Sequence, residues 1–246
     1  MLCRDLSAAQ VVRAEIIGQV PHAAVHVVHC DLASLASVRN SAEAVRNQYP
    51  RIGLLVNNAG IVSVRHHMSV DGFELTFATN HLGPFLLTAL LSGCLDETAR
   101  VINVASRVHL RGRLDFDSIT SPRARYNSMA AYAQSKLANV LHTFALARRF
   151  AGTHICVNCL HPGVVATNLL PRWLRVIKPL LSPIILDAER GARTTLHLAL
   201  AESVAGMTGL YFDENQQPTA AAPPAGDLQL QESLWKMSSQ WVGLPP

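Results

Sequence analysis

A tyrosine and a lysine lie four positions apart in a segment of strong helical character. Tyr132 and Lys136 should therefore project from the same face of a helix. The ordinary pKa of a tyrosine is about 10, and a nearby ammonium group favours the phenolate, which suits the phenol to general acid or base work near neutral pH. Such a pair can donate a proton to a carbonyl or accept one from an alcohol. Alone the pattern is weak, because Tyr-x-x-x-Lys often arises by chance on helix surfaces.

Two polar residues upstream could serve the same chemistry. Ser106 ends a predicted strand, where its hydroxyl could donate a hydrogen bond to a substrate oxygen or could simply cap a helix or turn. Asn80 falls inside a predicted helix, which is an unfavourable place for asparagine. It indicates either a local irregularity of the helix, which would expose a backbone carbonyl to a chain of water, or the capping of a helix end.

The elements that must position these residues alternate between strand and helix. We predict strands at 25–29, 52–56, 100–104, 154–160 and 209–212, and helices at 7–18, 34–49, 71–97, 128–150 and 188–201. Strands of about five residues separated by helices indicate βαβ units and a parallel sheet covered on both faces. Ligands of such sheets bind beyond the carboxyl ends of the strands. The expected fold is α/β, a doubly wound parallel sheet in one domain spanning residues 1–246.

We interpret the last part of the chain as structural rather than catalytic. Residues 218–226, rich in Pro and Ala, are expected to form a surface loop. After them, four large apolar residues recur at helical spacing. We interpret this stripe, Leu230, Leu234, Met237 and Trp241, as a packed helix face.

Composition excludes several classes of function. The chain has 246 residues, of which 49% are hydrophobic and 15% charged, which predicts a large core and excludes disorder. The net charge of +4 comes without a basic stripe carrying aromatic residues, so no nucleic acid partner is expected. Neither an apolar leader at residues 1–13 nor a stretch of about 18 uncharged apolar residues is visible, so we predict no membrane span and a cytoplasmic location.

Cysteines and histidines give no sign of a metal. The five cysteines are scattered, which is typical of a reduced intracellular protein. Cys156 and Cys159 form a C-x-x-C within a predicted strand, where residues three apart face opposite ways, so we interpret them as buried strand residues. The remaining histidines, including His66, His67 and His109, lack metal-site spacing and are interpreted as surface or loop residues.

Taken together, five ordered motifs resemble those of the short-chain dehydrogenase/reductase family. They are Asn57-Asn58-Ala59-Gly60, Asn80, Ser106, Tyr132-x-x-x-Lys136 and Pro162-Gly163. Four segments are similar to the retinol-dehydrogenase-like subgroup, namely Asp71-Gly-Phe-Glu74, Asn80-His-Leu-Gly83, Ser135-Lys-Leu-Ala-Asn-Val140 and His161-Pro-Gly-Val-Val165. The resemblance implies a Rossmann-like fold and an oxidoreductase that transfers a hydride between a nicotinamide and a lipophilic carbonyl or alcohol.

The same resemblance implies a role for each catalytic residue. Tyr132 would be the general acid/base, and Lys136 would lower its pKa and bind the nicotinamide ribose. Ser106 would orient and polarise the substrate oxygen. Asn80 would hold a water molecule that links Lys136 to solvent.

Cofactor contacts are implied in the same way. The segment Asp31–Leu32 would meet the adenine, although Asp31 could also be a turn or cap residue. Further contacts would come from Asn58, Ala59 and Gly60 on the adenosine half, and from Pro162, Gly163, Val165 and Thr167 near the nicotinamide. Arg4 stands where an arginine can pair with the 2′-phosphate, which favours NADP (NADPH) over NAD; a frayed terminal arginine is the alternative.

The sequence departs from the family at its beginning. The first strand, the Thr-Gly-x-x-x-Gly-x-Gly turn that holds the pyrophosphate, and the first helix have no counterpart in it. The expected sheet is therefore truncated at the N-terminus, with a gap and unpaired strand edges. Three explanations stay open: an error in the gene model, a genuine truncated product with weak or no cofactor binding, or completion of the sheet by another chain. The alternative to an active reductase is thus a non-catalytic homologue that acts as a binding module or is inactive.

Substrate and partners are constrained only loosely. The segment 167–186 is apolar with interspersed Arg172, Arg175 and Lys178; in the family it is the substrate lid, and its apolar content predicts a lipophilic substrate. A basic amphipathic helix can also rest on a membrane surface, so peripheral membrane contact through 169–186 is an alternative to a lid alone. By resemblance, a homodimer or homotetramer would pair through 71–97 and 128–150.

Overall fold

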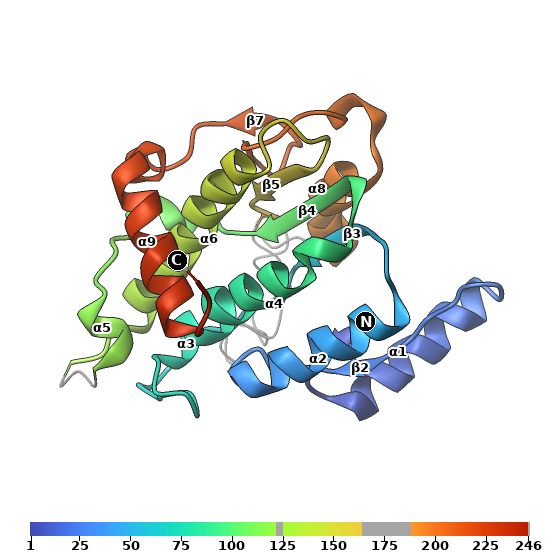
Figure 1. The fold of residues 1–246 in the computed structure, drawn as a ribbon, viewed down its shortest axis with the longest axis horizontal. Coiled ribbons are helices and arrows are strands. Elements are labelled where there is room, and N and C mark those ends of the chain that lie inside the picture. The colour runs from blue at the N-terminus through green and yellow to red at the C-terminus, as the bar shows by residue number, and fades with distance from the viewer. Residues whose placement is uncertain (122–124, 164–187, 246) are drawn as a thin grey trace, which may run out of the picture.

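The strands of the described residues form two sheets. A computed structural model describes residues 1–121, 125–163 and 188–245. One sheet has the order β3-β4-β5-β6-β7 and the other contains only β1 and β2 (Figure 1). The strands are β1 (Leu2–Cys3), β2 (Val28–His29), β3 (Ile52–Asn57), β4 (Leu95–Val104), β5 (Cys156–Leu160), β6 (Tyr211–Phe212) and β7 (Pro218–Thr219).

All pairs except the last are parallel, as the alternation of strands and helices predicted. Only β7 runs antiparallel to its neighbour β6. Within the described residues β3 pairs with β4 alone, and its Leu54 remains 41% exposed. The edge of β3 that faces away from β4 is therefore unpaired in this part of the chain.

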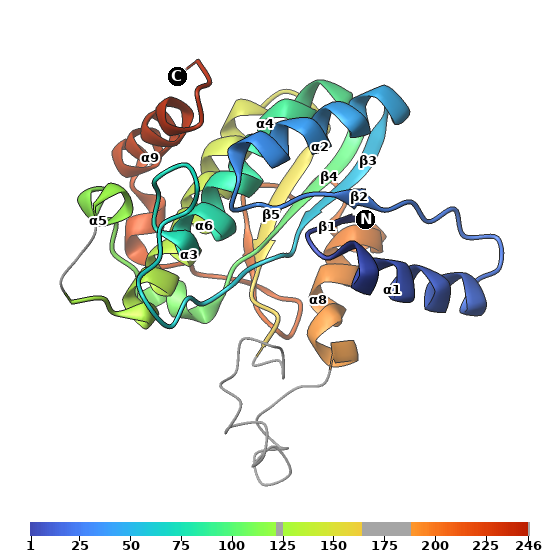
Figure 2. The same cartoon turned by 90° about the horizontal axis from the view of Figure 1, so that it is seen from below.

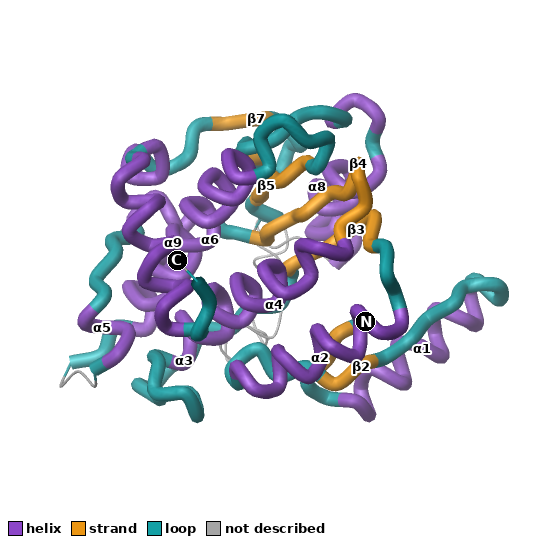
Figure 3. The backbone as a smooth tube through the Cα atoms, in the orientation of Figure 1, coloured by secondary structure: helices purple, strands orange, loops and turns teal. Residues whose placement is uncertain are grey.

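Helices cover both faces of the larger sheet (Figures 2 and 3). The helices of the described residues are α1 (Leu6–Gln19), α2 (Leu35–Gln48), α3 (Leu75–Phe77), α4 (Gly83–Leu91), α5 (Asp117–Thr120), α6 (Ser128–Arg149), α8 (Ala188–Leu200) and α9 (Leu228–Trp241). Figure 2 shows α2, α4 and α6 on one side of the sheet and α8 on the other. Shorter turns are the π-helix η1 (Ala78–Leu82) and the 3-10 helices η2 (Ser92–Cys94), η3 (Arg107–Arg111), η5 (Glu202–Val204) and η6 (Pro223–Gly226).

Helix starts follow local sequence signals. Ser34 caps α2 by accepting a hydrogen bond from the Ser37 backbone N–H, as predicted. Asn127 caps α6 with its side-chain oxygen, which accepts from the backbone N–H groups of Met129 and Ala130. Because α6 begins at this fixed point, the register of every residue on it, including the candidate catalytic ones, is set from its first turn.

The helix predicted over 71–97 is wrong at both ends. Helical structure begins only at Leu75 and ends with η2, and Leu95 already starts β4. The reason is tertiary: Leu95 is the register partner of Ile52 in the neighbouring strand, so sheet pairing overrides the local helical pattern. Of the two alternatives predicted for Asn80, an irregular helix or a capped helix end, the structure shows the first, as the π-helix η1.

The surface loop predicted over 218–226 is also corrected. Pro218 and Thr219 form β7 beside β6, and residues 223–226 form η6. Proline is tolerated there because β7 lies at the edge of the sheet, where a missing N–H costs little. The helix predicted from the apolar stripe that follows is confirmed as α9.

Buried side chains fill both faces of the larger sheet. Toward α4 and α6 the core contains Phe77, Phe85, Leu137 and Leu141, none more than 2% exposed. Toward α8 a second cluster contains Ile102, Leu160, Leu198 and Phe212. Cys156 and Cys159 are both buried in β5, as predicted.

A polar ladder crosses the buried face of the sheet below α4 and α6. Asn57 and Asn103 are register partners, and Nδ2 of Asn57 donates to Oδ1 of Asn103 at 2.8 Å and to Oγ1 of Thr88 at 3.0 Å. Asn103 in turn donates to Oγ1 of Thr143 at 2.9 Å. These bonds tie β3 and β4 to α4 and α6. They therefore fix the carboxyl ends of the central strands against the helix that carries Tyr132.

Candidate active site

Tyr132 and Lys136 share one face of α6, at the carboxyl end of β4. Lys136 is 3% exposed, and its Nζ donates to the carbonyl oxygen of Val104 at 2.7 Å. The same ammonium group lies 5.7 Å from the centroid of the Tyr132 ring. Burial lowers the pKa of Lys136 to about 8, because a charged group loses its hydration there. The site thus contains a cation that is held by a backbone carbonyl beside the tyrosine.

Ser106 meets Tyr132 from the end of β4. Burial raises the pKa of Tyr132, and a side-chain hydrogen bond with Ser106 acts against that rise. Ser106 also caps η3, since its Oγ accepts from the Val108 backbone N–H at 3.4 Å. While Oγ accepts that bond, its own proton remains available for Tyr132 or for a substrate oxygen. The structure therefore brings Ser106, Tyr132 and Lys136 together, as the sequence predicted.

Asn80 lies in η1 and is 1% exposed. Its Oδ1 accepts from the Ile61 backbone N–H at 2.7 Å, and its Nδ2 donates to the Ile61 carbonyl at 2.9 Å and to Oγ of Ser135 at 3.0 Å. The Ser135 hydroxyl donates in turn to the backbone carbonyl of Tyr132 at 2.8 Å. The side chain of Asn80 therefore joins the segment after β3 to the helix that carries Tyr132, and the water contact expected of Asn80 stays a prediction.

The segment after β3 passes close to the lysine. A Cβ at Gly60 would lie 3.3 Å from both Oδ1 of Asn80 and Nζ of Lys136, so this position favours glycine. Asn58 and Ala59 are exposed just before it. An open backbone above a buried cation fits a polar ligand that lies across the carboxyl end of β3.

The predicted cofactor contacts Arg4, Asp31 and Leu32 follow the strands of the smaller sheet. Arg4 follows β1, is exposed and makes no ion pair within the described ranges. Oδ1 of Asp31 accepts from the Ala33 backbone N–H at 3.0 Å, so this aspartate closes a turn after β2. Leu32 is packed tightly against the start of α4, since a Cβ at Gly83 would lie 2.4 Å from the Leu32 carbonyl oxygen. A free guanidinium beside a fixed turn fits the phosphate-bearing end of an NADP-type cofactor.

The nicotinamide contacts are described only in part. Pro162 and Gly163 follow β5 directly, and Gly163 adopts φ +82°, which favours glycine. The predicted contacts Val165 and Thr167 lie outside the described residues. So does the segment 169–186, for which a lid or membrane contact was expected.

The interpretation of His109 as a surface or loop residue is wrong. It is fully buried in η3, three residues after Ser106. Its Nδ1 donates to the Ser106 carbonyl at 2.7 Å, and its Nε2 accepts from the Ala222 backbone N–H at 3.1 Å. The only available signal was its spacing, because three residues make one turn of a 3-10 helix.

Two other histidines are corrected in the same way. His81 and His142 are 1% and 5% exposed, and they lie among Phe85, Trp235 and Ser238 in the core between α4, α6 and α9. Burial lowers the pKa of His142 to about 3, so it is neutral at physiological pH. These two residues pack against aromatic rings and lie outside the site.

Comparisons with known proteins agree with this geometry. Residues 2–175 match the family model of the short chain dehydrogenases. The chain is 39% identical over 254 aligned residues to human retinol dehydrogenase 13, covering 99% of this chain and 76% of that protein. A crystal structure of an uncharacterised protein from Mycobacterium paratuberculosis is 32% identical with a TM-score of 0.76, covering 99% of this chain and 83% of that one. A blue fluorescent protein from a metagenomic library, crystallised with NADPH, shares the fold at 24% identity and a TM-score of 0.67, covering 86% and 83%.

Proposed function

Because the chain belongs to the short-chain dehydrogenase family, we propose that it transfers a hydride between NADP and a lipophilic carbonyl or alcohol. The observation that carries this proposal is the meeting of Tyr132, Ser106 and Lys136 at the carboxyl end of β4. A phenol, a hydroxyl donor and a buried cation at one place are the groups needed to move a proton to or from a reacting oxygen.

In the direction of carbonyl reduction, each residue has a separate role. A bound nicotinamide supplies the hydride. The Ser106 hydroxyl orients the carbonyl oxygen by a hydrogen bond, and Tyr132 gives its phenolic proton to the same oxygen as negative charge develops there. The ammonium of Lys136 stabilises the phenolate left behind, and Asn80 keeps the catalytic helix and the segment after β3 in register.

NADP is favoured over NAD by Arg4. Its guanidinium is exposed and has no partner in the described ranges, and a planar, bidentate donor suits a phosphate. A lipophilic substrate is supported by the likeness to human retinol dehydrogenase 13, which makes all-trans-retinal the first carbonyl to test.

A cofactor titration followed by thermal unfolding tests the proposal. A ligand that binds only the folded chain raises its melting temperature in step with concentration. We expect a saturable rise with NADPH, a smaller one with NADH, and loss of that preference in Arg4→Ala. Arg46→Ala, an exposed arginine on α2, is the matched control. Oxidation of NADPH upon addition of all-trans-retinal would then establish turnover.

The second candidate is a non-catalytic homologue that binds a partner or is inactive. It is favoured by one observation: the strands of the described residues form two separate sheets, so β1 and β2 are not hydrogen-bonded to the sheet that carries the candidate site. The same titration separates the two candidates. A folded chain whose melting temperature does not respond to either nucleotide would support the non-catalytic one.

A further inference from the structure

We propose that His109 is a positioning residue that fixes the catalytic serine and couples it to the C-terminal segment. The inference rests on the proposed function, because it assigns a role toward Ser106 in that same site. Nothing in the family motifs of this sequence includes His109; the structure alone points to it.

The hydrogen bonds of His109 define its protonation state. The Ser106 carbonyl can only accept, so Nδ1 must carry the proton. The Ala222 backbone N–H can only donate, so Nε2 must be bare. The ring is fully buried and tilted against Tyr211, with centroids 4.6 Å apart. Burial lowers the pKa of His109, which keeps this single neutral tautomer in place.

The bonds of His109 close the turn that begins at Ser106. The Ser106 carbonyl accepts from Nδ1 and also from the backbone N–H of His109 at 3.0 Å. The end of the turn is pressed against the catalytic helix, since a Cβ at Gly112 would lie 2.6 Å from the Ala133 carbonyl and 2.7 Å from Cβ of Leu137. Without the His109 side chain, the carbonyl of Ser106 loses the hydrogen bond from Nδ1 that anchors it.

The position of the Ser106 hydroxyl follows from that anchor. Its bond from the Val108 N–H is long at 3.4 Å, so it holds the serine only weakly. The side-chain hydrogen bond between Ser106 and Tyr132 is the contact that affects the proposed reaction, because it lowers the pKa of the Tyr132 phenol. A displacement of about 1 Å in a reacting group can cost about 10²-fold in rate. His109 therefore acts on catalysis through Ser106.

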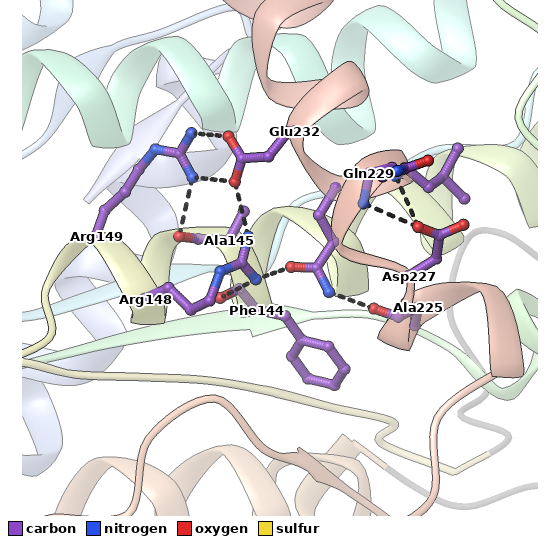
Figure 4. A network of polar contacts seen from close by, with 10 residues as sticks. Phe144, Ala145, Arg148, Arg149, Ala225, Asp227, Gln229 and Glu232 are labelled. Atoms are coloured by element: carbon purple, nitrogen blue, oxygen red, sulfur yellow. Dashed lines mark hydrogen bonds and ion pairs between the residues drawn. The ribbon is translucent and has the colours of Figure 1, made fainter.

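The other ring nitrogen reaches the C-terminal segment, residues 222–232. Ala222 accepts from the Ala225 backbone N–H at 2.8 Å, and the Ala225 carbonyl accepts from Nε2 of Gln231 at 2.6 Å. Gln231 also accepts from Arg148 near the end of α6, in the network that Figure 4 shows. A continuous path of hydrogen bonds thus runs from the catalytic serine through His109 to the far end of the catalytic helix.

The first test is spectroscopic and needs no substrate. The chain has four tyrosines, so labelling their ring Cζ carbons with carbon-13 and titrating by NMR gives the pKa of Tyr132, with Tyr132→Phe for assignment. We expect the pKa of Tyr132 to rise in Ser106→Ala and to rise in the same direction in His109→Phe. The double variant should add nothing further, because both changes remove one interaction. His154→Phe, an exposed histidine before β5, should leave the titration unchanged.

The second test is kinetic, with NADPH and all-trans-retinal as probes. His109→Phe should lower kcat by about 10²-fold and leave the Kd for NADPH within a factor of about 2. His109→Asn keeps a donor for the Ser106 carbonyl and should recover much of the loss; it also serves if the Phe variant does not fold. A Tyr132 pKa that moves in Ser106→Ala but stays at the wild-type value in both folded His109 variants would overturn the proposal. If the titrations behave as expected but wild type shows no turnover, the proposed function fails and the positioning role stands.

Discussion

Tyr132 and Lys136 are both largely removed from water, and burial acts on their protons in opposite directions. It raises the pKa of the phenol and lowers that of the ammonium, because the neutral form is favoured in each case. The expectation that Lys136 lowers the pKa of Tyr132 stays a prediction, since in this structure the opposing contribution comes from Ser106. The ammonium is held instead by the Val104 carbonyl.

Removing the phenolic hydroxyl tests its role directly. Tyr132→Phe should reduce turnover by about 10²- to 10⁴-fold, the usual contribution of a general acid. Its melting temperature should change little, since the ring and its packing are kept. Steady-state kinetics with NADPH and all-trans-retinal, beside a thermal melt, measure both. Wild-type activity in this variant would refute the assigned mechanism.

Lys136 should leave a signature in the pH dependence of stability. Its pKa is about 8 in the folded chain against 10.5 ordinarily, so the unfolded chain binds more protons between these values. The free energy of unfolding contributed by Lys136 therefore rises as the pH rises from 8 toward 10.5. Below pH 8 the Lys136 ammonium is charged in the folded chain. Its burial then lowers the free energy of unfolding by on the order of 3 kcal/mol.

Urea denaturation of wild type and Lys136→Met across pH 7 to 9 measures this cost. The variant should be the more stable protein at pH 7, and its advantage should shrink by about 1 kcal/mol by pH 9. Subtracting one protein from the other removes the titration of the cysteines and tyrosines, which both share. A constant difference over this range would mean that the pKa of Lys136 is not lowered.

Among the elements, the C-terminal helix α9 is joined to the end of α6 by two unlike sets of contacts (Figure 4). Glu232 forms ion pairs with Arg148 and Arg149 at 2.8 and 2.7 Å, but its side chain is 54% exposed. Gln231 is 2% exposed and bonds both Arg148 and the Ala225 carbonyl. Exposed ion pairs contribute little, whereas a buried polar group left without its partner is costly.

Adjacent substitutions on α9 separate the two kinds of contact. Gln231→Ala should lower the free energy of unfolding by about 1 to 3 kcal/mol, because it strands the buried Ala225 carbonyl. Glu232→Ala should cost at most about 1 kcal/mol, and less in high salt. Chemical denaturation at low and high ionic strength gives both values. Equal losses at both positions would contradict this division.

For the whole molecule, α9 packs against parts of the segments through which a partner chain was expected to pair. Trp241 packs on Phe73 and Phe77, and Trp235 on Phe85 and His142. These partners lie in or beside α3, α4 and α6, the elements that form the predicted dimer segments 71–97 and 128–150. A dimer through this face would require α9 to move.

This arrangement predicts that the intact chain does not associate through α4 and α6. In Trp235→Ala/Trp241→Ala the aromatic contacts are lost and apolar surface is exposed, which favours association. We expect light scattering after size exclusion to show a larger, concentration-dependent mass for the double variant, and no change for Glu232→Ala. A double variant that keeps the wild-type mass at every concentration would show that this face does not bind a second copy.

The sequence by itself determined the parallel α/β fold, the helix start at Ser34 and the set Ser106, Tyr132 and Lys136, and it limited Asn80 to an irregular helix or a helix end. Each of these depends on local spacing or on motif order, which the chain carries without reference to its fold. Tertiary structure alone decided that residues 95–97 belong to β4, that His81 and His142 belong to the core, and that His109 is buried against the carbonyl of Ser106. Those outcomes depend on contacts between residues distant in the chain, such as Leu95 with Ile52 and His109 with Ala222, and no local pattern encodes which distant partner a side chain will meet.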